Sequence, residues 1–152
     1  MKGGTNMRHL TALIIALFAL TGAYAQSDLA INPLFKGSDK WNLKFAATHI
    51  EGEMLEDYNL TLFRSITTGD SRLFTEIEET IEKDAATAID KECGYINGKL
   101  YYGFYVFKPR KNKYRYIFYR NSSLRSDEKD EVTIVYMEGY PSLKELKKMF
   151  QK

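Results

Sequence analysis

The chain has 152 residues, with 22 basic and 20 acidic side chains and a formal net charge of +2. This length suits one domain with its own core. The near-balance of charge gives no reason to expect nucleic acid as a partner. The single cysteine excludes an internal disulfide, so packing must stabilise the fold.

Residues 1–25 are predicted to be a secretory signal peptide. Lys2 and Arg8 form its positive n-region, residues 10–20 form an uncharged apolar h-region, and small residues form a cleavage site at its end. The h-region is shorter than the roughly 20 apolar residues of a transmembrane span. Cys93 is far from the new N-terminus, so a lipid anchor is not expected. We therefore expect an exported protein, in the periplasm or outside the cell, with no transmembrane segment in the mature chain.

Cleavage would leave residues 26–152 as a single exported α+β domain. Removing the two basic residues of the n-region from 22 leaves 20, against 20 acidic residues, so the apparent positive charge vanishes. Near the start of this domain, Pro33 is expected to exclude a regular helix. Leu34 and Phe35 are expected to anchor this stretch on the edge of the domain.

Two strands and a helix are predicted next. Weak alternation in residues 41–50 and clear alternation in residues 59–67 indicate strands, joined by an acidic connection in residues 52–58. Asp70 or Ser71 can cap a helix that covers one face of the sheet. The apolar residues at helical spacing are Leu73, Phe74, Ile77, Ile81, Ala85 and Ala88.

An aromatic hairpin within residues 94–119 is the centre of the predicted sheet. Asn97-Gly98 between alternating apolar runs is a strong signal for a two-residue hairpin turn. This loop sets Tyr95 opposite Leu100 and Cys93 opposite Tyr102, and directly opposed residues share a face. The expected core face contains Cys93, Tyr95, Leu100, Tyr102, Phe104 and Val106.

The opposite face of this hairpin is expected to be partly exposed to solvent. Burying Lys113 and Arg115 unpaired would cost several kcal/mol, so their side of the strand should meet solvent. The predicted binding face on this side consists of Tyr101, Tyr105, Arg115 and Tyr119. Tyrosine rings bind sugar faces or partner side chains. The alternative is that helices and the N-terminal segment cover both faces and the tyrosines are core residues.

The chain ends with a polar turn in residues 126–131, a strand in residues 132–137 and a helix. Ser142 and Glu145 form a capping box at the start of that helix. The order of elements suits an α+β fold with a single antiparallel sheet of about five to six strands. Both helices are expected to pack on one face.

Several runs of the chain resemble a family of small exported Bacteroidetes proteins catalogued only as a domain of unknown function. The resemblance is carried by residues 61–65, 90–95, 100–105, 119–125, 136–139 and 143–150. It spans nearly all of the mature chain and implies a Bacteroidetes source and an envelope destination. It brings no catalytic residues to this sequence.

Three sets of residues are candidates for catalytic or metal chemistry. Cys93 needs a base to act as a nucleophile, and His49 is the only histidine of the mature chain. His49 and Glu51 would share a strand face, but two ligands fall short of a metal site. Asp90 and Glu92 have the same spacing, and exposed strand carboxylates explain them as well as a paired-carboxylate site does. No complete constellation results, and neither a cofactor nor a metal is expected.

The residues favour a non-enzymatic binding or interaction module with an envelope protein or a glycan as partner. One alternative is a small hydrolase or thiol-dependent enzyme that uses Cys93 or the pair Asp90 and Glu92. Another is a regulatory partner of a membrane complex. The basic loop in residues 108–113 is a second candidate surface, for phosphate or anionic glycan, or a solvated turn. The oligomeric state stays open.

Overall fold

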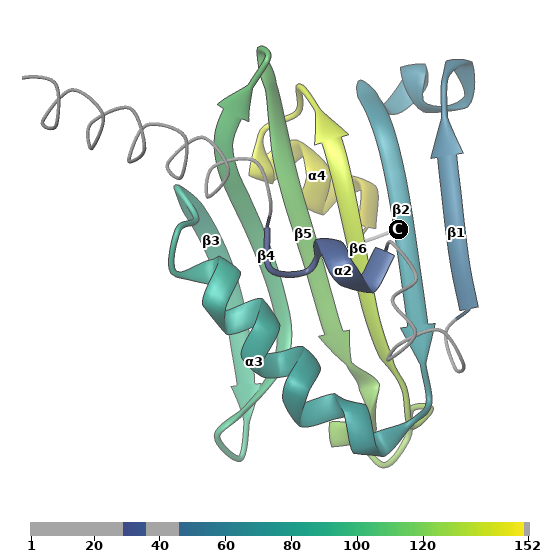
Figure 1. Ribbon diagram of the computed structural model, residues 1–152, viewed down its shortest axis with the longest axis vertical. Helices are drawn as coiled ribbons and strands as arrows, with labels where there is room; N and C mark the ends of the chain where they lie inside the picture. Colours follow the sequence, from purple (N-terminus) through teal and green to yellow (C-terminus); the bar gives the residue numbers. More distant parts are fainter. Residues whose placement is uncertain (1–28, 36–45, 151–152) are drawn as a thin grey trace, which may run out of the picture.

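Six antiparallel strands form one sheet in the computed structural model, which describes residues 29–35 and 46–150 (Figure 1). The strands are β1 (Ala46–Glu51), β2 (Leu60–Thr68), β3 (Asp90–Ile96), β4 (Lys99–Arg110), β5 (Lys113–Asn121) and β6 (Val132–Gly139). Their order in the sheet is β1-β2-β6-β5-β4-β3, so β1 and β3 are the two edges. The predicted signal peptide and its cleavage site lie outside the described residues.

Helices lie on both faces of this sheet. Figure 1 shows α2 (Asn32–Phe35) and α3 (Phe74–Ala85) in front of the sheet and α4 (Leu143–Phe150) behind it. Short 3-10 helices occur at η1 (Glu53–Tyr58), η2 (Ser71–Leu73) and η3 (Ser122–Leu124). The predicted α+β class with one antiparallel sheet is confirmed. The expectation that both helices share one face is wrong, because the sheet has an apolar layer on each side.

Two separate apolar clusters explain the position of the helices. On one face, Ile77 and Ile81 of α3 pack in a cluster with the buried residues Tyr105, Ile117 and Tyr119. On the other face, Leu146 of α4 belongs to a second cluster. The strand residues of that second cluster include Val106, Tyr116, Val135 and Met137. Each helix therefore covers apolar surface that water would otherwise contact.

The predicted helix signals are present in the structure. The Asp70 side chain accepts a hydrogen bond from the Arg72 backbone N–H, at 3.3 Å, ahead of α3. Before α4, the Ser142 backbone N–H donates to Glu145 Oε2 at 2.6 Å, and the Glu145 N–H donates to Ser142 Oγ at 3.2 Å. This is the predicted capping box. Pro33 lies in the first turn of α2, where the missing N–H costs nothing, so the exclusion of a helix there was wrong.

A buried carboxylate joins the N-terminal segment to α3. Asp84 Oδ1 accepts from the Ala30 N–H at 2.6 Å, and Asp84 Oδ2 accepts from the Ile31 N–H at 3.0 Å. Ile31 and Leu34 are buried in the α3-side core. The Phe35 ring lies 6.3 Å from the Tyr136 ring. The predicted anchor is therefore real, and it lies on the face of the sheet rather than at its edge.

The aromatic hairpin has the predicted turn but a different register beyond it. Asn97 and Gly98 have φ of 51° and 77°, and Tyr95 pairs with Leu100 as expected. Tyr101 is then an extra residue, because Gly94 pairs with Tyr102 and Cys93 pairs with Gly103. The bulge adds one residue to β4. Each residue of β4 beyond it therefore faces the side of the sheet opposite to the one that an uninterrupted ladder with β3 would give it.

The bulge and the second helix together change which face is core. Cys93 and Leu100 share the α3 side with Tyr105, not with Phe104. Tyr105 and Tyr119 are 2% and 0% exposed, so the expectation that their face is partly exposed to solvent is wrong. Phe104, predicted to be core, is only half-buried on the α4 side.

Candidate functional site

The α4-side face of the sheet consists of rows of opposed residues, and α4 covers only part of them. One row contains Met137, Tyr116 and Val106, which are 0–5% exposed and share a cluster with Leu146 of α4. The next row contains Phe118 and Phe104, which are half-buried. The row after it contains Tyr102 opposite the exposed Arg120. Exposure therefore increases along the sheet away from α4.

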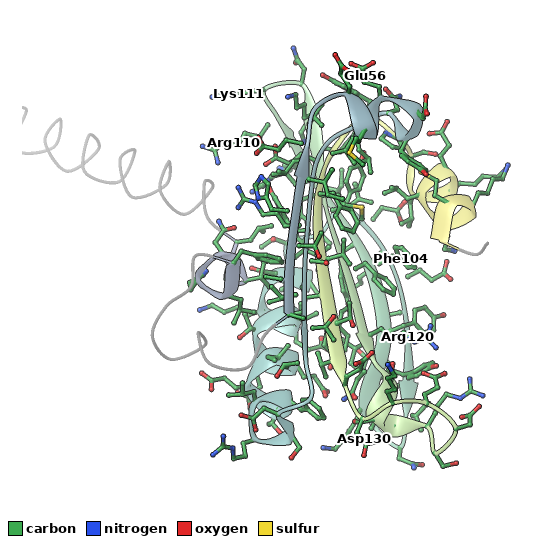
Figure 2. All side chains as sticks on the ribbon, turned by 90° about the vertical axis from the view of Figure 1, so that its right-hand side faces the viewer. Glu56, Phe104, Arg110, Lys111, Arg120 and Asp130 are labelled. Atoms are coloured by element: carbon green, nitrogen blue, oxygen red, sulfur yellow. The ribbon has the colours of Figure 1, made fainter. Side chains whose placement is uncertain are left out.

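The open part of this face is rich in aromatic side chains. The rings of Phe104 and Phe118 lie 4.7 Å apart at 42°. The rings of Tyr101 and Tyr102 meet edge to face at 6.1 Å, because the bulge lets two consecutive residues approach the same side. Figure 2 shows Phe104 and Arg120 on the same side of the sheet as α4. We name Tyr101, Tyr102, Phe104 and Phe118 the aromatic surface.

A charged network borders the aromatic surface. Arg120 Nη2 donates to Glu128 Oε1 at 2.7 Å and to Tyr101 Oη at 3.0 Å, and Tyr101 Oη donates to Glu128 Oε1 at 2.9 Å. The Arg120 and Arg125 guanidinium carbons lie 5.5 and 5.8 Å from the Tyr101 ring centre. The hydrogen bond from Tyr101, followed by the one from Arg120, lowers the pKa of Glu128. Tyr101 is thus fixed at the rim between two cations.

The four residues of the predicted binding face are not brought together. Tyr101 is at the rim of the aromatic surface, on the α4 side. Tyr105 and Tyr119 are buried on the α3 side. Arg115 is half-buried on that same side, opposite Glu138 of β6.

Sequence reasoning missed Tyr102, Phe118 and Arg120 as members of an open surface. Alternation along β4 and β5 does place Tyr102, Phe104, Phe118 and Arg120 on one side. The short length of α4, which the sequence also indicates, could have shown that part of this face stays open. Its eight residues cover about 12 Å at 1.5 Å per residue, too little to cover a face of six strands.

The catalytic candidates are widely separated or already paired. Cys93 is on β3 and His49 is on β1, the opposite edge of the sheet. Five strand spacings of about 4.8 Å separate these strands by roughly 24 Å. Glu92 forms an ion pair with Lys147 of α4. His49 is therefore too far from Cys93 to act as its base.

His49 and Glu51 do share a strand face, as their spacing predicts. Their side chains lie 2.8 Å apart and are 51% and 62% exposed. Within residues 29–35 and 46–150, no group of three or more His, Cys, Asp or Glu side chains could hold a metal ion. The two residues form a surface pair.

An apolar hollow of about 420 Å³ lies on the α4 side near the β1 edge. Residues of β1, η1, β2 and α4 line it: Ile50, Met54, Leu55, Tyr58, Leu60, Phe63 and Met149. Met54 is 76% exposed and Tyr58 is 51% exposed at its mouth. Apolar surface on this face therefore extends beyond the aromatic surface.

The fold and these surfaces define an α+β domain with a sheet face that the helices of the described residues leave partly open. The chain belongs to a family of unknown function, DUF6108, whose model matches residues 18–150. The resemblance to a family without an assigned function is thereby confirmed. No curated protein and no solved structure shows significant similarity to the chain. Among the helices of the described segments, none has the length and apolar character required to cross a membrane.

Proposed function

We propose that this chain is an exported, non-enzymatic interaction module whose aromatic surface docks a protein partner. The observation that carries the proposal is the half-buried Phe104–Phe118 pair beside the Tyr101–Arg120–Glu128 network. Protein interfaces combine an apolar, aromatic centre with a polar rim, and they are enriched in Tyr, Phe and Arg. The open face has this composition and this arrangement.

The position of the rings favours a protein over a small molecule. Small ligands usually bind in concave pockets that enclose most of their surface. The aromatic surface instead lies on adjacent strands of an open sheet face, and the hollow on this side lies near the other edge, between η1 and α4. Contact with Tyr102, Phe104 and Phe118 would remove their remaining exposed area from water.

Site-specific photo-crosslinking in the native host tests this proposal. A photoreactive phenylalanine analogue at Tyr102 should form a covalent adduct with one protein, identified by mass spectrometry. The same analogue at Glu79, an exposed residue of α3 on the opposite side, is the matched control and should not form that adduct. Failure to form a Tyr102-specific protein adduct would contradict the proposal.

The purified partner then permits a quantitative prediction. Phe104→Ala should weaken its binding by about 1–4 kcal/mol, because buried aromatic anchors account for most interface energy. Binding is measured by titration calorimetry. Glu79→Ala should bind like the wild type. Equal binding by Phe104→Ala and wild type would mean that the partner docks elsewhere.

A further inference from the structure

Two arginines on the α3 side each have a buried guanidinium nitrogen without a hydrogen-bond partner. Arg64 is on β2 and Arg115 is on β5, and both are half-buried. The Nε atoms of both are fully buried and have no hydrogen-bond partner. Within the described part of the chain, neither side chain forms an ion pair. Arginine is rarely removed from water unless it is paired, because an unpaired cation loses its hydration without compensation.

The two arginines flank the same stretch of β6. Arg64 pairs with Tyr136 of β6, and Arg115 pairs with Glu138, two residues further on. Strand spacing sets β2 and β5 about 10 Å apart across β6, within the combined reach of two arginine side chains. Burial and a hydrogen bond to Glu138 raise the pKa of Tyr136, and the positive charges of Arg115 and Arg64 oppose that rise. Both cations therefore act on Tyr136, which is itself 6% exposed and packs beside the Phe35 ring.

Each carboxylate near this place has at least one oxygen that another group contacts. Glu138 Oε1 accepts from Tyr136 Oη at 2.8 Å. Both oxygens of Asp84 accept from backbone N–H groups of the N-terminal segment. Glu51 Oε1 is bonded to His49, which pairs with Arg64 across the strands. Glu138 lies opposite Arg115 across the strands, and the positive charge of Arg115 acts on Asp84, but no ion pair with a described residue holds either guanidinium group.

The β4–β5 hairpin adds positive charge at the same end of the sheet. Lys113 lies two residues before Arg115 and so shares its side of β5. Figure 2 shows Arg110 and Lys111 at the hairpin tip, on the side of the sheet that carries α2. Such a basic rim attracts anions over a distance before they bind.

We propose that Arg64 and Arg115 form a binding site for an oxyanion group, a phosphate or a carboxylate, carried by a small ligand. A guanidinium group donates two parallel hydrogen bonds to either group, and such charge-assisted pairs are the strong ones. An oxyanion bound between the two guanidinium groups would compensate both cations at once. This site is on the face opposite the aromatic surface and is independent of the proposed docking there.

Nuclear magnetic resonance of the arginine Nε–H groups tests the site on the unaltered protein. Inorganic phosphate and acetate are titrated separately at constant ionic strength, and the anion that binds more tightly identifies the class of ligand. The Nε–H signals of Arg64 and Arg115 should move in a saturable manner with at least one anion. Signals that stay fixed with both anions would overturn the proposal.

Matched variants separate the site from general attraction to basic surface. Arg64→Gln and Arg115→Gln should each reduce affinity for the bound anion by about tenfold or more, the expected loss of charge-assisted hydrogen bonds. Arg72→Gln, ahead of α3, removes an exposed cation that is already paired with Asp70, and should leave the affinity unchanged. Equal affinity in all three variants would mean adventitious ion binding only. In anion-free buffer, Arg115→Gln should also unfold at the same or a higher temperature than wild type, because it removes an unpaired cation.

Discussion

Tyr105→Ala should lower the free energy of unfolding by about 3–5 kcal/mol, the usual loss when a large buried ring is removed. Tyr105 is 2% exposed, and its ring packs directly on Gly103. A Cβ at Gly103 would lie 2.5 Å from two carbons of that ring, so the glycine leaves the space that the ring fills. Urea unfolding followed by circular dichroism measures the loss.

Phe104→Ala is the matched control, because Phe104 is the neighbour of Tyr105 on β4 and faces the opposite side. It is half-buried, so its removal should cost clearly less than the removal of Tyr105. Tyr105→Phe should be close to neutral or stabilising, since Tyr105 Oη is buried and has no hydrogen-bond partner within the described residues. If Tyr105→Ala cost no more than Phe104→Ala, the placement of the core under α3 would be wrong.

Local signals in the sequence predicted much of the fold correctly. Asn97-Gly98 sets the hairpin turn, and Ser142 with Glu145 starts the last helix, because each motif satisfies backbone groups within a few residues. The bulge at Tyr101 has no such local signal. Its effect is to place Leu100 in the core and Tyr101 at the Arg120–Glu128 network, and both partners are distant in sequence.

The candidate site was harder to predict because both faces of the sheet are apolar. A strand such as β4 has large side chains at consecutive positions from Phe104 to Phe107, so alternation alone cannot rank one side over the other. The charge of Arg115 led to the expectation that its side of β5 is exposed to solvent. In the structure, Arg115 lies on the side of Ile117 and Tyr119, which α3 and the N-terminal segment cover in part. A charged residue on a strand therefore indicates that its own surroundings are partly exposed, and not that the whole face of the sheet is.

Asp84→Asn should release the N-terminal segment from α3 and lower the free energy of unfolding by about 1–3 kcal/mol. The carboxylate accepts two N–H groups, from Ala30 and Ile31. The amide of asparagine has one acceptor oxygen, so one of these buried N–H groups would lose its partner. Hydrogen exchange at Ile31 should become about tenfold faster or more, while amides of β5 remain protected. Unchanged exchange at Ile31 would show that apolar burial alone holds the segment.

The pH dependence of this variant follows from the electrostatics of Asp84. Burial raises the pKa of this carboxyl, against the lowering effect of the Ala30 and Ile31 N–H groups and of Lys83 and Arg115. The folded protein therefore binds more protons than the unfolded chain between the two pKa values. The contribution of Asp84 to stability is fully present below the unfolded pKa and decreases as pH rises through the folded pKa.

Subtracting the unfolding free energy of Asp84→Asn from that of the wild type at each pH isolates this contribution. We expect the difference to shrink as pH rises through the acid range. A difference that grew with pH would mean that the two N–H groups stabilise the carboxylate by more than burial destabilises it. Asp84 would then hold the segment most firmly as an anion, and its pKa in the folded protein would lie below that of the unfolded chain.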